Sequence, residues 1–221
     1  MSKGITVEDA AALVPDGASL MIGGFMGVGS PHRLIAELVR QGRRNLTIIA
    51  NDTGVPNYGI GKLITAKAVK KIIASHIGLN PETQQQMIAG EIDVELCPQG
   101  TIAERIRAAG YGLGGVLTPT GVGTIVAEGK RQVDVNGQTF LLEPPLHADF
   151  SLIGAYMADY YGNLNYMLTA RNFNPVMAMA GKTVIAEAES IVPVGVIPPD
   201  QVVTPSVLVD HLVEREKTNG R

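Results

Sequence analysis

Short apolar runs that alternate with stretches of helical periodicity constrain the fold of this 221-residue chain more than any other feature. Each run is four to seven residues long, which suits a strand buried on both faces of a sheet. Strands alternating with helices predict an α/β fold, with an open, mostly parallel sheet covered by helices on both faces. The predicted strands are Ser19 to Ile22, Leu46 to Ala50, Val69 to Ser75, Asp93 to Leu96, Phe150 to Tyr156 and Thr183 to Ala188.

Residues with capping chemistry mark the expected helix starts. Thr6 stands three residues before Asp9, Ser30 precedes Pro31, and Asn80 precedes Pro81. A short polar side chain accepts from the free N–H groups of a first turn, and proline suits the first helical position. The expected helices run from Thr6 to just before Pro15, from Pro31 to Gly42, from Asn80 to Gly90, from Thr101 to Gly110 and from Asn174 to Gly181.

One segment departs from this alternation. Asn136-Gly137 separates Arg131 to Val135 from Gln138 to Leu142, and Asn-Gly accepts the positive φ angles of a type I′ turn. We therefore expect a β-hairpin that forms a small antiparallel layer. The tail from Glu214 to Arg221 is expected to fray.

Composition and charge narrow the class of protein. Hydrophobic residues make up 45% of the chain and the net charge is −3, so neither nucleic acid nor a membrane is an expected partner. Cys97 is the sole cysteine, which excludes an intramolecular disulfide. The first ten residues lack a signal-peptide layout, and no apolar run is long enough to span a bilayer. We expect one domain over residues 1–221, located in the cytoplasm.

The loop Gly23-Gly24-Phe25-Met26-Gly27-Val28-Gly29 joins the first predicted strand to the second predicted helix. Such a loop exposes backbone N–H groups to an anionic ligand. Gly24, Gly27 and Gly29 are spaced three and then two apart, the reverse of the dinucleotide fingerprint. Ser30-Pro31 stands where a phosphate loop needs Lys followed by Ser or Thr. By spacing alone, a ligand site and a tight structural turn both remain open.

A longer pattern distinguishes between them. Asp16-Gly17, Leu20-Met21-Ile22, Gly23-Gly24-Phe25, Gly29 and Pro31 stand at intervals that resemble the signature of class I coenzyme A (CoA) transferase alpha subunits. The likeness extends from about Thr6 to Val213, and short-chain members acting on acetate and acetoacetate are most similar. Further blocks that resemble the family are 51–54, 96–101, 117–124 and 170–174.

The resemblance implies a CoA transferase-type fold and a known chemistry. A glutamate attacks the acyl-CoA thioester to give an acyl-glutamyl anhydride, which CoA thiolate converts into an enzyme–CoA thioester; a second carboxylic acid reverses the sequence. In the family this glutamate lies in a Ser-Glu-Asn-Gly stretch of the beta subunit or of the C-terminal half, and that tetrapeptide does not occur in these 221 residues. A homologous beta subunit in an α2β2 assembly is therefore expected to carry it, with Glu187 and Glu189 as less favoured candidates.

The resemblance also assigns roles to residues of this chain. Asn51 and Gln99 are expected to be supporting catalytic amides that stabilise an oxyanion, with Gln99 held in a turn between Pro98 and Gly100. Asp52 stands where some relatives carry a second asparagine, and its charge would repel a carboxylate substrate if it faced the acyl pocket. The expected CoA-contacting residues are Gly24, Phe25, Met26, Gly27, Val28, Gly29 and Ser30.

For most of the remaining candidate site residues, a structural role is favoured over a functional one. The histidines lack metal-ligand spacing, so no metal is expected, although His32 could contact a phosphate. Cys97 is expected to be a buried, unreactive thiol. The basic run Lys62, Lys67, Lys70 and Lys71 is expected to form a solvated helix face, with contact to CoA phosphates as the less favoured alternative. Residues 156–161, with Tyr166 and Met167, are a possible contact surface or core. CoA and acyl-CoA are expected as substrates, without a permanently bound cofactor. The alternatives are a sugar-phosphate isomerase and a ligand-sensing module.

Overall fold

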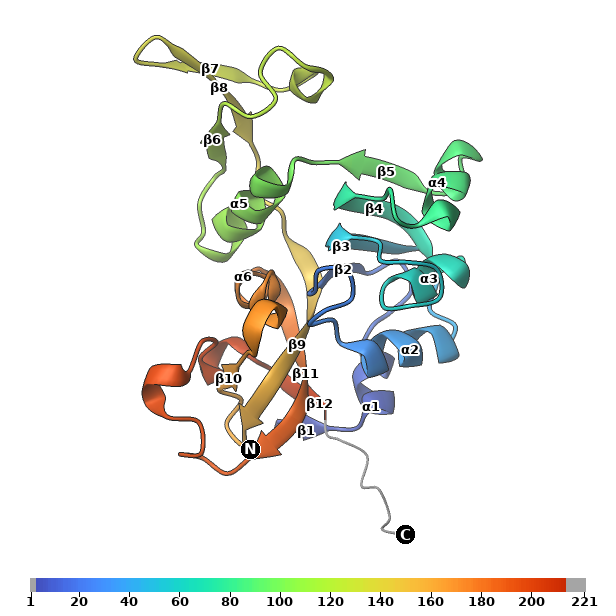
Figure 1. The fold of residues 1–221 in the computed structure, drawn as a ribbon, viewed down its shortest axis with the longest axis vertical. Coiled ribbons are helices and arrows are strands. Elements are labelled where there is room, and N and C mark those ends of the chain that lie inside the picture. Colours follow the sequence, from blue (N-terminus) through green and yellow to red (C-terminus); the bar gives the residue numbers. More distant parts are fainter. Residues whose placement is uncertain (1–2, 214–221) are drawn as a thin grey trace.

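The computed structural model describes residues 3–213, and a large, mostly parallel sheet runs through its centre (Figure 1). The strand order is β1-β12-β11-β9-β2-β3-β4-β5, with every neighbouring pair parallel, and β10 pairs antiparallel with β9. The predicted α/β class is confirmed, whereas the predicted tail lies outside the described residues. The strands are β1 Gly4–Ile5, β2 Ser19–Ile22, β3 Leu46–Asp52, β4 Val69–His76, β5 Asp93–Leu96, β9 Ala148–Asp159, β10 Leu164–Asn165, β11 Gly181–Val192 and β12 His211–Val213.

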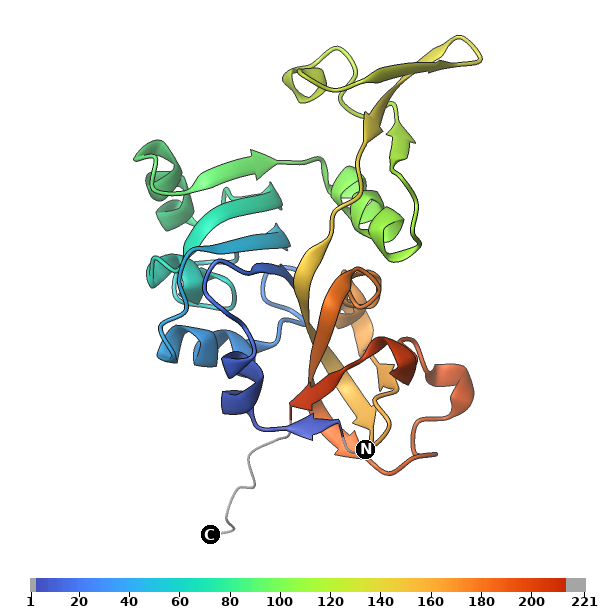
Figure 2. The same cartoon turned by 180° about the vertical axis from the view of Figure 1, so that it is seen from behind.

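Helices cover both faces of this sheet, as Figures 1 and 2 show from opposite sides. Along β2, Leu20 and Ile22 pack in the core cluster that contains the apolar residues of α1 to α3, whereas Met21 packs with those of α5 and α6. This alternation follows from the two-residue period of a strand. The helices are α1 Val7–Ala12, α2 His32–Arg40, α3 Gly61–Thr65, α4 Pro81–Ile88, α5 Gln99–Gly110 and α6 Asn174–Met177.

A small antiparallel sheet projects from the body between β5 and β9 (Figure 1). It contains β6 (Val116–Thr118), β7 (Gln132–Val135) and β8 (Gln138–Glu143), in the order β6-β8-β7. At the turn, Asn136 and Gly137 have φ values of 55° and 79°. The hairpin predicted from Asn-Gly is confirmed.

The strand order changes direction next to β2. The chain runs outward through β3, β4 and β5, and then returns to the other side of β2 with β9. In open parallel sheets, the crevice at the carboxyl ends of the strands on either side of such a point is the usual place for a ligand. The glycine loop follows β2 and therefore lies at this position.

Several predicted boundaries are corrected. Ser30 does not cap α2, because its hydroxyl donates to the Gly23 carbonyl and Pro31 takes the N-cap position. Gln99 is the first residue of α5 rather than part of a turn. By contrast, Thr6 and Asn80 cap α1 and α4 as predicted. No helix within residues 3–213 is long and apolar enough to cross a membrane.

Candidate functional site

The glycine loop is a tight, hairpin-like turn after β2. Phe25 and Val28 exchange backbone hydrogen bonds of 3.0 and 2.9 Å across it. Met26 and Gly27, between them, have φ values of 52° and 83°, in the left-handed region that favours glycine. Phe25 and Val28 are both exposed. The loop therefore presents two apolar side chains at the carboxyl end of the sheet.

Two asparagines from the far side of the sheet clamp this loop. Asn172 accepts from the N–H of Gly24 at 3.1 Å and donates to the Val28 carbonyl at 2.9 Å. Asn174 is fully buried and donates to the Gly29 carbonyl at 3.0 Å. Asn172 directly follows η2 (Leu168–Arg171), and Asn174 is the first residue of α6. They tie the loop to a segment that lies about 145 residues away in sequence.

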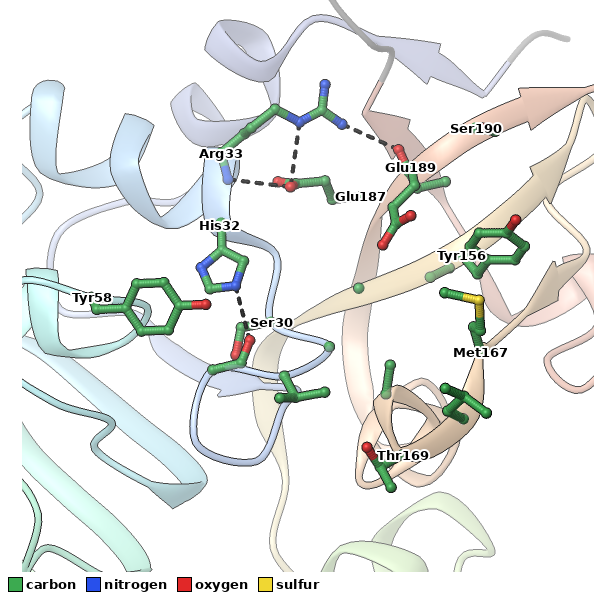
Figure 3. A pocket seen from close by; sticks show the side chains of 18 residues that line it. Ser30, His32, Arg33, Tyr58, Tyr156, Met167, Thr169, Glu187, Glu189 and Ser190 are labelled. Atoms are coloured by element: carbon green, nitrogen blue, oxygen red, sulfur yellow. Dashed lines mark hydrogen bonds and ion pairs between the residues drawn. The ribbon is translucent and has the colours of Figure 1, made fainter.

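His32 and Tyr58 support the loop from the side of α2. His32 Nε2 lies 2.8 Å from the Gly27 carbonyl, and its ring centroid is 4.9 Å from that of Tyr58. Figure 3 shows His32 and Tyr58 at one edge of a cavity whose lining also includes Gly27. His32 therefore contacts the loop backbone.

Asn51 and Asp52 end β3 beside the loop, and both are buried. Asp52 Oδ2 accepts from Asn51 Nδ2 at 2.7 Å and from the Met26 N–H at 2.9 Å, while its Oδ1 accepts from the Gly54 N–H at 2.8 Å. Both oxygens of a carboxylate accept hydrogen bonds, and both oxygens of Asp52 do so here. Asp52 therefore faces the glycine loop.

Gln99 joins this set from the start of α5. Its Nε2 donates to Asn51 Oδ1 at 2.7 Å, and Ser75 Oγ lies 3.1 Å from the same oxygen. The side chains of Gln99, Asn51 and Asp52 thus form a hydrogen-bonded relay that ends at the loop. Asn51 and Asp52 are buried, whereas Gln99 is exposed. The second hydrogen of the Gln99 amide is therefore available to a ligand.

Two large cavities lie on either side of the loop. The first, of about 920 Å³, is lined by loop residues 27–30 and by the ends of β9 and β11, and we call it the Glu189 cavity. The second, of about 810 Å³, is lined by Phe25, Gln99 and residues of α5, α6 and 203–208, and we call it the Gln99 groove. Of the predicted site residues, Gly27 to Ser30 line the Glu189 cavity and Phe25 and Gln99 line the Gln99 groove. Gly24, Met26 and Asn51 line neither of these two cavities.

The Glu189 cavity contains both candidate glutamates (Figure 3). The Glu187 carboxylate accepts from the N–H groups of Arg33 and Leu34, at 3.2 and 2.8 Å, and pairs with the Arg33 guanidinium. It therefore caps α2 in place of Ser30 and is held by three donors. Glu189 is exposed at the cavity wall.

The other predicted candidates lie apart from the glycine loop. Cys97 is buried, and burial raises the pKa of its thiol, which agrees with an unreactive side chain. The lysines do not share a helix face, because Lys70 and Lys71 lie on β4, and Lys67 pairs with Glu91 at 2.8 Å. Tyr166 belongs to the interior, where burial raises its pKa to about 12. Within residues 3–213, no cluster of His, Cys, Asp or Glu is suited to a metal.

Sequence reasoning missed the clamping role of Asn172 and Asn174. Both lie in the block 170–174, which carries part of the family resemblance, so a signal was present. The partners of these side chains are set by the packing of η2 and α6 against the loop. A local pattern does not contain that information.

Comparison with known proteins agrees with the sequence resemblance. A family model described as coenzyme A transferase matches residues 5–215. The chain is 51% identical to the acetate CoA-transferase subunit alpha of Escherichia coli K12 over 98% of this chain and 99% of that protein. It is also 51% identical to the acetoacetyl-CoA:acetate/butyrate CoA transferase alpha subunit of Clostridium acetobutylicum, over 96% and 98%.

Solved structures share the fold at lower identity. An acyl-CoA transferase of Escherichia coli O157:H7, in a thioester complex with CoA, superposes with a TM-score of 0.86 at 24% identity. That match covers 97% of this chain but 47% of the other, so this chain spans about half its length. Glutaconate CoA-transferase from Acidaminococcus fermentans gives a TM-score of 0.87 at 22% identity, over 96% and 75%. The predicted type of fold is therefore confirmed.

Proposed function

This chain belongs to the coenzyme A transferase family, and from that premise we propose that it is the alpha subunit of an enzyme that moves CoA between a short-chain acyl-CoA and a carboxylic acid. Acetate, acetoacetate and butyrate are the proposed class of acids. The relatives that support this class are named for acetate and for acetoacetyl-CoA with acetate or butyrate. The relatives named above support neither the isomerase nor the sensor. We take residues 1–221 as one domain; the cytoplasmic location stays a prediction.

The observation that carries the proposal is the relay from Gln99 through Asn51 to Asp52 and the glycine loop. The exposed Gln99 amide offers an N–H to the oxyanion that forms when a thioester carbonyl is attacked, and the relay fixes that amide in position. Asn51 holds the Gln99 amide by accepting its other N–H on Oδ1. We propose both as catalytic amides and the loop Gly24–Ser30 as the segment that contacts CoA.

The nucleophile is proposed to be a glutamate of a homologous beta subunit. Its carboxylate attacks the acyl carbonyl and expels CoA thiolate, leaving an acyl-glutamyl anhydride. The thiolate then attacks the glutamyl carbonyl and releases the first carboxylate, and a second carboxylate completes the exchange in reverse. Glu187 is an unsuitable substitute because three donors already engage its carboxylate. We propose that this chain and the beta subunit form an α2β2 assembly. Acyl-CoA is its proposed substrate, and we propose no permanently bound cofactor.

Borohydride trapping tests this division of labour. The complex of this chain with its co-purified partner is incubated with acetoacetyl-CoA and then with borohydride, which reduces a glutamyl-CoA thioester to an alcohol. We expect this chain to keep its intact mass while the partner's mass changes. A mass change in this chain would overturn the proposal and direct attention to Glu189. Exchange between acetate and acetoacetyl-CoA, measured on the same complex, tests the activity itself.

A further inference from the structure

Gln99 is the first residue of α5, and no side chain caps this end of the helix. Pro98 takes the N-cap position and forms no side-chain hydrogen bond with the first turn. Only Cys97 and Pro98 separate the end of β5 from Gln99, and we call residues 97–99 the β5–α5 corner. The position of the Gln99 amide relative to Asn51 therefore depends on how α5 is anchored at this corner.

Arg105, further along α5, contacts both the corner and the strand before it. Its side chain is buried, and it lines neither the Glu189 cavity nor the Gln99 groove. Its Nη1 donates to Glu95 Oε1 on β5 at 2.8 Å and to the sulfur of Cys97 at 3.7 Å. One guanidinium nitrogen thus joins the helix to the end of β5 and to the first residue of the corner.

The other side of Arg105 holds the chain that returns from the projecting sheet to β9. Its Nε donates to the Pro144 carbonyl at 3.0 Å, and its backbone carbonyl accepts from the Leu146 N–H at 3.0 Å. Nε also lies 3.9 Å from Oε2 of Glu143, which is fully buried and pairs through Oε1 with Lys130 at 2.6 Å. Arg105 therefore links α5 to segments on both sides of it in the sequence.

The shape of the arginine side chain matters here as well as its charge. A guanidinium group is planar and presents several donors in a fixed arrangement. In Arg105, Nε and Nη1 donate to different segments at the same time. A lysine would keep a positive charge beside Glu143, but it would bring a single nitrogen on a flexible stem. Lysine therefore conserves the charge of this network without its rigid geometry.

We propose that Arg105 is a positioning residue for the transfer reaction: by fixing the β5–α5 corner, it holds the Gln99 amide in place at Asn51. This inference rests on the proposed transferase function. An oxyanion donor stabilises a transition state best when it is already in position as charge develops. A misplacement of about 1 Å can cost on the order of 10²-fold in rate. Because Arg105 lines neither cavity, its effect on the reaction passes through Gln99.

A double-mutant cycle tests this route. In the co-purified complex, Arg105→Lys should lower kcat for exchange between acetate and acetoacetyl-CoA by about tenfold and leave KM within about twofold of wild type. In a Gln99→Ala background, the same substitution should change kcat by less than about twofold, because the group that Arg105 positions is gone. A residue with a general structural role would lower kcat equally in both backgrounds.

Arg40→Lys is the matched control. Arg40, in the last turn of α2, also uses two nitrogens to bind a carboxylate, that of Glu37, and it lines neither cavity. Its substitution should leave kcat unchanged. If Arg105→Lys lowers kcat by the same factor with and without Gln99, or leaves it unchanged, the inference is wrong while the transferase function stands.

Cys97 provides a second measurement that does not depend on activity. It is the sole cysteine of the chain and is 3% exposed, so its alkylation by iodoacetamide, followed on the intact mass of this chain, reports opening of the corner. Arg105→Lys should speed this alkylation several-fold, and Arg40→Lys should not. Burial raises the pKa of the thiol and the hydrogen bond from Arg105 opposes that rise. Loss of this bond alone would slow the reaction, so faster alkylation reports access.

The outcomes separate the two proposals. If the wild-type complex exchanges no acyl groups, the proposed function fails, and the alkylation rate alone decides whether Arg105 holds the corner. An unchanged alkylation rate in the folded Arg105→Lys variant would overturn that role. Faster alkylation together with an unchanged kcat, in a complex that exchanges acyl groups, would overturn the link from Arg105 to Gln99.

Discussion

The carboxylate of Asp52 accepts a hydrogen bond from the side-chain amide of its neighbour Asn51 at 2.7 Å. This contact sets the direction of the Asn51 amide, because its nitrogen is drawn to Asp52 and its oxygen is left for Gln99. The same carboxylate holds the Met26 N–H of the glycine loop. Asp52 thus couples the position of the loop to the orientation of both proposed catalytic amides.

Asp52→Asn is expected to lower kcat for acyl exchange by about tenfold or more. An amide has one acceptor oxygen, whereas Asp52 uses two, so either a backbone N–H loses its partner or the Asn51 amide turns around. Steady-state kinetics of the co-purified complex measure the effect. Asp149→Asn is the matched control, because Asp149 anchors Ser19 at the amino end of β2. Equal losses of kcat in both variants would indicate a general structural effect.

Gln99→Ala should reduce kcat by roughly 10²-fold to 10³-fold, the usual cost of removing an oxyanion donor. KM for the acyl-CoA should change little, and thermal unfolding should shift only slightly because Gln99 is exposed. Gln138→Ala, on the projecting hairpin, removes the same type of side chain far from the loop and should leave both constants unchanged. A large rise in KM with normal kcat would assign Gln99 to binding instead.

Gly23→Ala is expected to destabilise the fold by about 2–4 kcal/mol, in the range of overpacked core substitutions. A Cβ atom at this position would lie 1.7 Å from Asn174 Oδ1, in a side chain that is buried and engaged in three hydrogen bonds. Urea unfolding measures the loss. A Cβ atom on Gly114 would meet no atom within 4 Å, so Gly114→Ala should change stability by less than about 0.5 kcal/mol. Similar losses for the two variants would contradict the clamp.

Acid should weaken the anchor at the amino end of β2. The Ser19 hydroxyl and backbone N–H, followed by Lys182, lower the pKa of Asp149 from 3.8 to about 2. Because this pKa is lower in the folded chain than in the unfolded one, the contribution to stability is present above about pH 4 and is lost as the pH falls toward 2. Urea unfolding of wild type and Asp149→Asn, followed from pH 6 to pH 3, should show the difference in stability shrinking. A constant difference would contradict the assigned cause.

The sequence predicts features that depend on neighbouring residues. Asn136-Gly137 forms its turn and Asn80 caps its helix because each needs only residues close by in the chain. Ser30 fails as a cap because Gly23 and Glu187, brought near by the sheet, offer other partners. The resemblance supplies Asn51 and Gln99, but the hydrogen bond between them depends on how α5 packs at the end of the sheet.

The clamp on the glycine loop has a consequence for the order in which the molecule folds. Strands β2 to β5 lie within the first hundred residues and can pair with one another early. The Gly24 N–H and the carbonyls of Val28 and Gly29 gain their side-chain partners only when Asn172 and Asn174 dock against the loop. Such distant contacts form late, because a long chain must first be closed. The loop therefore reaches its final conformation only after residues in the last third of the chain have packed against it. Ligand affinity at the loop would then report that folding is complete.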